Sequence, residues 1–222
     1  MSDAQTYGYE VVRTLEAAFY TSESIYQKER NTLFTRTWQY AGHLSRVANP
    51  GDYFSFEIAG QGLFCIRDNK NVLHTFYNVC QHRAHQIVEG QGEGKKTLVC
   101  PYHAWSYHLD GHLLRGPNTE VVPAQVREKI CLTPVRTQEF CGFIFVNLDD
   151  DADPMEDWYP GVEAELRDFV PQIDRLAPVE TIRADEKCNW KVSVENYSEC
   201  YHCRINHRTF STGVVKPDTY DI

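Results

Sequence analysis

The chain has 222 residues, of which 42% are hydrophobic and 24% charged, a composition typical of globular proteins and sufficient for one large domain or two small ones. Its net charge of −9, with no lysine- or arginine-rich stripe, argues against a nucleic-acid partner. No apolar run approaches the ~20 residues of a membrane-spanning helix, and the polar start, Met1-Ser2-Asp3-Ala4-Gln5, is unlike a signal peptide.

The first predicted element is a helix over residues 22–38. Thr21 or Ser22 can cap its N-terminus, and apolar residues recur along one face of the predicted helix. This helix belongs to a segment that precedes the first residues with strand character.

Short runs rich in β-branched and aromatic residues dominate the next part of the chain. The first three, at 53–58, 63–67 and 72–78, are separated by turn sequences at 59–62 and 68–71, which predicts an antiparallel meander. Asp110-Gly111 is a strong hairpin signal further along. Further strands are predicted at 97–100, 105–109, 112–114, 134–138 and 142–148.

The pattern changes after an acidic turn at 149–154. Residues 155–170 are predicted to be helical, 176–186 to form a strand and 190–201 to form another helix. The predicted domains are an N-terminal helical segment at 1–39, a β domain at 40–150 and the beginning of a further domain at 151–222.

Two short loops carry the densest set of metal-ligating residue types. Cys80-Gln81-His82 is followed, after seventeen residues, by Cys100-Pro101-Tyr102-His103, so each loop holds one thiol and one imidazole. In a Rieske [2Fe–2S] centre two Cys hold one iron and two His hold the other. The alternative is a Cys2His2 zinc site, although common zinc motifs pair Cys with Cys and His with His.

The same loops resemble the signature of Rieske oxygenase α subunits. The similarity rests on Cys80-Gln81-His82-Arg83 and on Cys100-Pro101-Tyr102-His103-Ala104-Trp105. The family usually has Gly where this chain has Ala84. The resemblance implies that Cys80, His82, Cys100 and His103 bind the cluster.

A second group of candidate residues lies near the end of the chain. Glu199 precedes His202 by three positions, so on a helix the two would share a face. His202 and His207 are five apart, about 500° of helix rotation, so both could bind one metal only if the helix opens between them. Two His and a carboxylate suit a non-haem ferrous site, whereas Cys200-x-x-Cys203 would suit a zinc or redox motif.

This region is similar to the start of the catalytic domain of Rieske oxygenases. The shared pattern is Asn189-Trp190-Lys191, then Glu195-Asn196, then Glu199-x-x-His202-x4-His207. The resemblance implies that His202 and His207 bind iron. It also implies that Glu199 bridges to His103 or His82 of a neighbouring subunit, with Asn196 as a supporting residue.

Glu at the bridge and the run Glu199-Cys200-Tyr201-His202-Cys203 are similar to the subgroup that acts on quaternary ammonium compounds such as carnitine and glycine betaine. Members of the family continue past the second His and carry a third iron ligand, an Asp, in the later part. Asp218 and Asp221 do not match that position, so we expect the chain to be the N-terminal part of an oxygenase α subunit, with the third ligand beyond Ile222.

These resemblances predict an α+β fold: an antiparallel Rieske domain, then the start of a helix-grip-like catalytic domain. They imply a [2Fe–2S] cluster, mononuclear Fe(II), electrons from NAD(P)H through a separate reductase, and a homotrimer that hydroxylates or N-demethylates a betaine-like substrate. Other possibilities are an aromatic ring-hydroxylating dioxygenase and a Rieske electron-transfer protein without oxygenase activity. Six Cys besides Cys80 and Cys100 could form disulfides in a secreted protein, but the start of the chain is unlike a signal peptide and a thiolate-bound cluster needs protection, so we expect reduced thiols in the cytoplasm.

Overall fold

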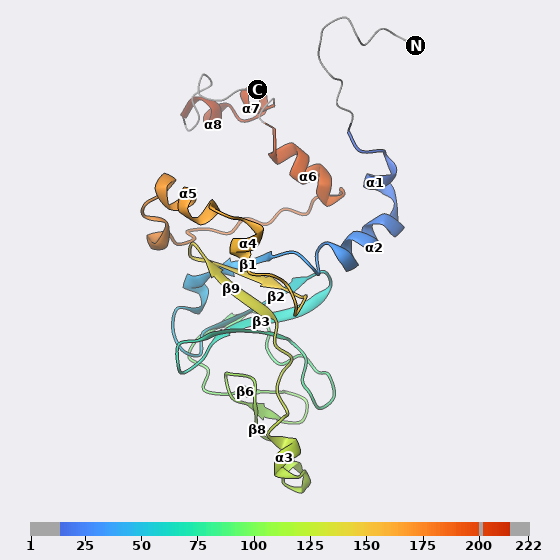
Figure 1. The fold of residues 1–222 in the computed structure, drawn as a ribbon, viewed down its shortest axis with the longest axis vertical. Coiled ribbons are helices and arrows are strands. Elements are labelled where there is room, and N and C mark those ends of the chain that lie inside the picture. The colour runs from blue at the N-terminus through green and yellow to red at the C-terminus, as the bar shows by residue number, and fades with distance from the viewer. Residues whose placement is uncertain (1–13, 200–201, 214–222) are drawn as a thin grey trace, which may run out of the picture. The chain divides into compact units, whose positions relative to one another are not determined.

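The computed structural model describes residues 14–199 and 202–213 (Figure 1). They form two compact units, one from residues 28–181 and the other from residues before 28 together with those from 182 onward. In the described part of the chain no helix is long and apolar enough to cross a membrane.

Two helices begin the described chain, α1 (Ala18–Thr21) and α2 (Glu23–Thr32). The helix predicted over 22–38 therefore ends earlier, and turns follow it. Threonine hydroxyls bond back to carbonyls four residues earlier, from Thr32 to Lys28 at 2.7 Å and from Thr35 to Asn31 at 2.9 Å. Such bonds compete with regular helix propagation.

The predicted meander is confirmed. Strands β2 (Tyr53–Ile58), β3 (Gln61–Arg67) and β4 (Leu73–Tyr77) pair antiparallel, and the short β5 (Gln91–Gly92) extends the sheet in the order β4-β3-β2-β5. The β2–β3 hairpin turns through Ala59 and Gly60, both at positive φ, as a tight two-residue hairpin requires.

Two three-stranded antiparallel sheets complete the β unit. One has the order β1-β10-β9, from β1 (Gln39–His43), β9 (Arg136–Phe140) and β10 (Phe143–Asn147). The other joins β6 (Leu98–Val99), β7 (Ser106–Tyr107) and β8 (Leu113–Arg115) in chain order. These sheets confirm the predicted antiparallel β architecture within an α+β fold.

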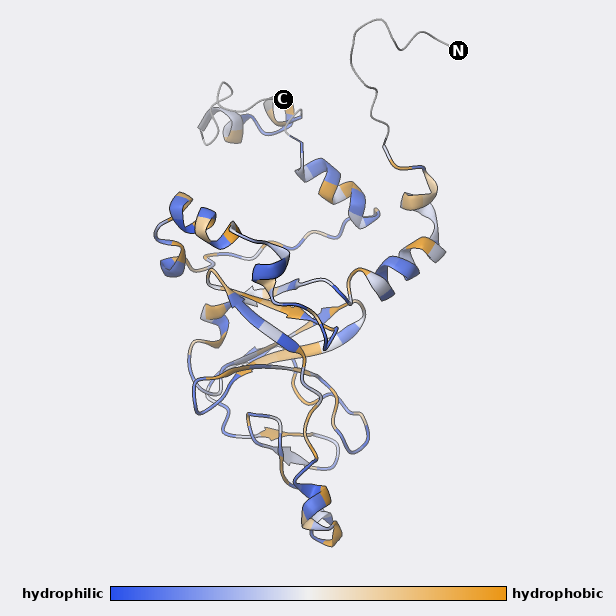
Figure 2. Ribbon diagram, viewed as in Figure 1, coloured by the Kyte–Doolittle hydropathy of each residue, from blue (hydrophilic) through white to orange (hydrophobic). Residues whose placement is uncertain are grey.

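Two apolar clusters form the core of this unit. One, around Phe54, Leu63 and Ile144, lies between the meander and the β1-β10-β9 sheet. The other, around Phe64, Phe76 and Tyr107, also includes the two candidate ligands Cys80 and Cys100. Figure 2 shows hydrophobic residues on β3, hydrophilic residues along β9, and both kinds on α5 (Val162–Phe169). The thiols of both ligand loops are therefore anchored in the core.

Short helical segments connect and follow the sheets. They are η1 (Leu44–Val47), η2 (Thr119–Val121), α3 (Ala124–Arg127), α4 (Met155–Trp158), η3 (Ile173–Arg175), α6 (Trp190–Tyr197), α7 (Cys203–Asn206) and α8 (Arg208–Gly213). The helix predicted over 155–170 is thus split into α4 and α5, and Gly161 between them has φ +81°.

The strand predicted over 176–186 is wrong. These residues have no regular secondary structure, and their apolar side chains are exposed, 102% for Val179 and 83% for Ile182. A strand needs a partner for its N–H and C=O groups, and no strand pairs with this segment in the described part of the chain. The helix predicted at 190–201 ends at Tyr197 as α6, and residues 200–201 lie outside the described residues.

Candidate functional site

The two ligand loops adopt the same backbone conformation. The N–H of Cys80 donates to the carbonyl of His85 at 2.9 Å, and the N–H of Cys100 donates to the carbonyl of Trp105 at 2.8 Å. In each case the bond joins the cysteine to the residue five positions later. The chain thus builds one turn twice, and each turn presents one cysteine and one histidine.

Each turn closes on an alanine in the left-handed region. The N–H of Ala84 donates to the carbonyl of Cys80 at 2.9 Å, and that of Ala104 to Cys100 at 3.0 Å. The φ values are +54° for Ala84 and +57° for Ala104, a region where glycine avoids a steric cost that alanine bears. This explains why glycine is common at the position of Ala84 in similar proteins.

The two thiols are buried together. Cys80 and Cys100 are each 2% exposed, and burial and then a hydrogen bond to Cys80 raise the pKa of Cys100. The hydroxyl of Tyr107 lies 3.2 Å from Cys80 Sγ and accepts the Gln81 N–H at 3.1 Å. Burial, followed by the bond to Cys80, raises the pKa of Tyr107, so its hydroxyl stays a donor.

The two imidazoles form the other half of the set. The rings of His82 and His103 meet edge to face, with centroids 4.8 Å apart. Nδ1 of His103 is buried without a hydrogen-bond partner in the described structure, and burial, then the nearby His82, lowers the pKa of His103. A pair of buried thiols beside a pair of imidazoles, one with an unpartnered ring nitrogen, fits the donor set of a [2Fe–2S] cluster with Cys2His2 ligation.

The second group gathers where the last helices meet. Helix α7 ends at Asn206 and α8 begins at Arg208, so the helix opens at His207. The rings of His202 and His207 consequently lie 5.2 Å apart between centroids, at 74°. In the described residues no third His, Cys, Asp or Glu joins them in a metal-binding group.

Glu199 contacts the first of these histidines directly. Its Oε1 lies 2.6 Å from Nδ1 of His202. The carboxylate accepts the Nδ1 proton and so fixes the tautomer in which Nε2 keeps its lone pair for a metal. A cavity of about 520 Å³ adjoins this pair, and Asn196 and Phe210 also line it.

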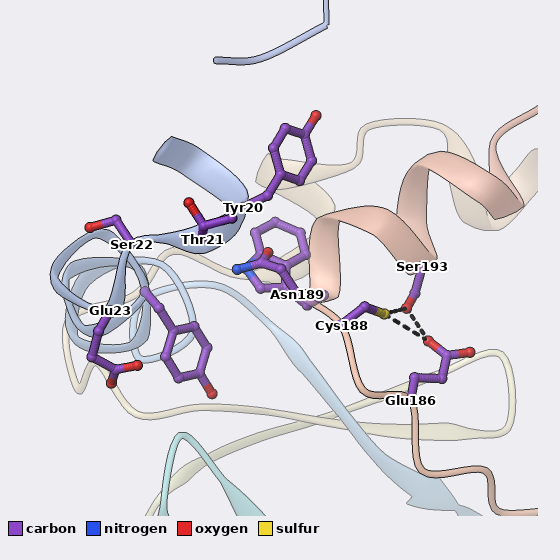
Figure 3. Close-up of a pocket in the computed structure, with 10 residues that line it drawn as sticks. Tyr20, Thr21, Ser22, Glu23, Glu186, Cys188, Asn189 and Ser193 are labelled. Carbon is purple, nitrogen blue, oxygen red and sulfur yellow. Dashed lines mark hydrogen bonds between the residues drawn. The ribbon is translucent and has the colours of Figure 1, made fainter. Parts of the chain in front are cut away.

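Helix α6, which carries Asn196, is anchored at its start. Asn189 caps it by accepting the N–H of Lys191 at 3.2 Å. A second cavity, of about 430 Å³, lies at this end of the helix (Figure 3). On its wall Ser193 donates to Glu186, and the Cys188 thiol lies 3.8 Å from the Ser193 hydroxyl. These polar contacts hold the segment that leads into α6.

Sequence reasoning found the ligand loops but not their supports. Tyr107 and the link from the Tyr20 hydroxyl to Glu195, at 2.5 Å, were not among the predicted site residues. Tyr20 and Glu195 are separated by 175 positions, so no local spacing signals their contact. Cys200, the first half of the alternative Cys-x-x-Cys motif, lies outside the described residues.

Two protein families match the chain. Residues 37–126 match the Rieske [2Fe-2S] domain, and residues 173–220 match the catalytic domain of the ring hydroxylating alpha subunit. The matched ranges contain both groups of candidate residues.

Curated relatives extend the similarity over most of the chain. The carnitine monooxygenase oxygenase subunit of Escherichia coli K12 is 39% identical over 90% of this chain and 54% of its own length. The glycine betaine monooxygenase oxygenase subunit of Pseudomonas aeruginosa PAO1 is 29% identical over 87% of this chain and 44% of its own. The chain therefore spans about half the length of these relatives.

Solved structures share the fold. The quaternary ammonium Rieske monooxygenase CntA in complex with L-carnitine has a TM-score of 0.83 at 36% identity, over 89% of this chain and 56% of that one. Naphthalene 1,2-dioxygenase with bound indole has a TM-score of 0.72 at 28% identity, over 87% of this chain and 44% of that one.

Proposed function

We propose that the chain is part of the α subunit of a Rieske non-haem iron oxygenase, in an oxygenase component that acts on a small quaternary ammonium compound. One observation carries the proposal: the same chain holds the Cys/His pair of loops and, in another compact unit, the His202–His207 pair with Glu199. A protein that only carries electrons needs the first group and not the second.

We assign the cluster to Cys80, Cys100, His82 and His103, and the mononuclear iron to His202 and His207. When bound, the cluster supplies single electrons and the ferrous iron supplies the open coordination positions at which O2 reacts. The protein's part is to bury the thiols, to hold the His82 and His103 rings next to each other and to orient His202 through Glu199.

Glu199 also suits the role of a bridge between subunits. A carboxylate has about four acceptor positions, so contact with His202 leaves capacity for a Rieske imidazole of a neighbouring subunit. Such a bridge requires a neighbouring subunit, and the family resemblance favours a homotrimer, with electrons from NAD(P)H delivered by a separate reductase in the cytoplasm. The domain limits 1–39, 40–150 and 151–222 stay predictions, as does the supporting role of Asn196.

The substrate class rests on relatives. Curated relatives act, by name, on carnitine and glycine betaine, and the choline monooxygenase of Beta vulgaris is 31% identical over 94% of this chain. The similarity to naphthalene 1,2-dioxygenase supports the second candidate, an aromatic ring hydroxylation. Oxygen uptake with a panel of betaines and arenes, in the presence of a reductase and NADH, separates the two.

The first test is to count iron and acid-labile sulfide per chain and to record the EPR spectrum of the dithionite-reduced protein. About three irons and two sulfides, with a Rieske signal, are expected if both centres are built. Two irons and two sulfides would leave only the cluster, and a protein with zinc and no labile sulfide would overturn the proposal.

A further inference from the structure

His82 differs from an ordinary metal-binding histidine in what surrounds its ring. Its imidazole stacks on the indole of Trp105, with centroids 4.9 Å apart and planes 7° from parallel. Its other ring contact is the edge of His103. Metal-binding histidines usually donate the second ring N–H to a carboxylate or carbonyl, and in the described residues the His82 ring has no such partner.

The indole that covers His82 is itself confined by Gly116. A Cβ atom at Gly116 would lie 2.5 Å from Cδ1 and 2.8 Å from Nε1 of Trp105, closer than side chains tolerate. The backbone of Gly116 is outside the left-handed region, so its conformation does not demand glycine. Glycine is needed at position 116 because a side chain there would overlap the Trp105 ring.

Gly116 is in turn fixed by Thr119. The Thr119 hydroxyl accepts the Gly116 N–H at 3.0 Å and donates to the Gly116 carbonyl at 2.7 Å. Thr119 is only 4% exposed, so this pair of hydrogen bonds to the backbone of Gly116 is shielded from water. The layers His82, Trp105, Gly116 and Thr119 therefore form a continuous support behind one imidazole.

We propose that Trp105 and Gly116 are positioning residues that set the ring plane of His82, with stacking in the place of a hydrogen bond. The proposal rests on the proposed function in one respect: His82 must be a cluster ligand. Because no described residue hydrogen-bonds the His82 ring, displacement of the indole would leave the bond to the cluster as the one restraint on the ring plane and would expose one face of the ring to water.

The test compares the full-length chain with Gly116→Ala by EPR of the reduced cluster and by labile sulfide per chain. The added methyl is expected to displace the indole, shift the g values and broaden the signal as the ring samples more orientations. Gly62→Ala is the matched control: its methyl would meet only Asn78 Cβ, at 4.0 Å, with an ordinary backbone conformation. It should reproduce the wild-type spectrum and sulfide content.

A double variant separates positioning from mere folding. Trp105→Ala removes the three ring atoms that a methyl at Gly116 would meet, Cδ1, Nε1 and Cγ, and so leaves room for that methyl. Gly116→Ala should therefore change the spectrum strongly beside Trp105 and little in the Trp105→Ala background, so that the double variant matches Trp105→Ala alone. If Gly116→Ala fails to hold a cluster, recovery of labile sulfide in the double variant supports the same conclusion.

Two results would overturn the positioning role. One is a Gly116→Ala protein with wild-type g values and full sulfide content. The other is an equal loss of labile sulfide in Gly116→Ala and in the double variant while Trp105→Ala holds its cluster, since Gly116 would then act on the fold and not on the indole. A wild-type chain without a Rieske signal would overturn the proposed function itself, which distinguishes that failure from both of these.

Discussion

Tyr107 is the residue whose hydroxyl reaches a candidate cluster ligand, at 3.2 Å from Cys80 Sγ, with no exposed surface. A hydrogen bond to a ligand sulfur stabilises the reduced, more negative cluster, and such bonds help to set its potential. Tyr107→Phe should lower the midpoint potential by about 60 mV, the one-electron equivalent of a bond contributing ~1.4 kcal/mol. A redox titration followed by EPR measures this shift.

Tyr40→Phe is the control for that experiment, because Tyr40 lies on β1 in the same unit and is 54% exposed. Its potential should equal the wild-type value. An unchanged potential in Tyr107→Phe, with full sulfide content, would show that the hydroxyl does not tune the cluster.

Ala84 bears a steric cost that the sequence alone did not reveal. With φ at +54°, alanine costs about 1–2 kcal/mol relative to ordinary backbone, and glycine avoids this at the expense of unfolded-chain entropy. Ala84→Gly should therefore raise the free energy of unfolding by about 0.5–1 kcal/mol. Urea unfolding of Ala84→Gly and of the wild type measures whether the free energy of unfolding rises as expected. Ala164→Gly, inside helix α5, should instead lower the free energy by about 1 kcal/mol.

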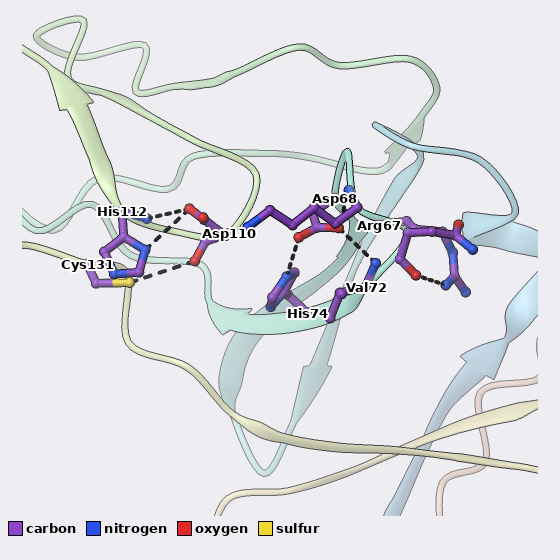
Figure 4. A network of polar contacts seen from close by, with 9 residues as sticks. Arg67, Asp68, Val72, His74, Asp110, His112 and Cys131 are labelled. Carbon is purple, nitrogen blue, oxygen red and sulfur yellow. Dashed lines mark hydrogen bonds and ion pairs between the residues drawn. The ribbon is translucent and has the colours of Figure 1, made fainter.

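At the scale of elements, the turn between β3 and β4 depends on one carboxylate (Figure 4). Asp68 accepts the N–H groups of Lys70 and Val72, both at 2.8 Å, and its other oxygen lies 3.1 Å from His74 Nε2. Burial by itself would raise the pKa of Asp68, but these hydrogen bonds outweigh it and lower the pKa. The ionised form is therefore the one that stabilises the turn.

The sign of the pH dependence follows from that lowered pKa. The Asp68 carboxylate contributes fully to the free energy of unfolding above the pKa of about 3.9 that it has in the unfolded chain. This contribution is lost as the pH falls through the lower pKa of the folded state. Asp68→Asn should unfold at lower urea concentration than wild type at pH 7, and the difference should shrink below about pH 4. Asp151→Asn, at an exposed turn position, should show neither effect. A pH-independent difference for Asp68→Asn would refute this reasoning.

Turn residues and the alternation of apolar residues predicted those strands whose partners lie nearby in the sequence. The β2–β3–β4 meander was predicted because its turns carry Gly, Asn and Asp beside alternating apolar residues. Strand β1 was missed because Ala41 and Gly42 have weak strand propensity, and its pairing with β10 joins residues about a hundred positions apart. The wrongly predicted strand at 176–186 has Val179, Thr181 and Ile182 near its centre, but the segment has no partner strand in the described structure.

In the candidate site, too, the sequence predicted the features that short motifs define and missed those that depend on the fold. Spacing revealed the four ligand-loop residues, since two short motifs define them. The contacts of Tyr107 with Cys80 and of Gly116 with Trp105 come from the fold of the β unit, and no motif encodes them. The five-residue spacing of His202 and His207 shows that a regular helix would separate the two imidazoles. The sequence therefore predicted that the helix must open if both bind one metal, but only the structure shows that it opens at His207.

At the scale of the whole molecule, the two candidate centres belong to different compact units. The cluster loops lie within residues 28–181, and His202 and His207 lie in the unit that contains residues from 182 onward. Helix α2 crosses the boundary between the two units but carries no candidate ligand, so removal of a ligand from one centre should leave the other intact. His202→Ala should therefore reduce the iron content by about one per chain, with about two sulfides and an unchanged Rieske signal.

Metal analysis and EPR on the same samples check this independence, with His108→Ala at an exposed position as the control. The reciprocal variant, Cys100→Ser, should lose the Rieske signal and labile sulfide while about one iron per chain remains. Loss of the Rieske signal in His202→Ala would show that the mononuclear site supports the cluster structurally. The two centres would then be coupled in folding as well as in electron transfer, and Glu199, which contacts His202, would be the first residue to examine for that coupling.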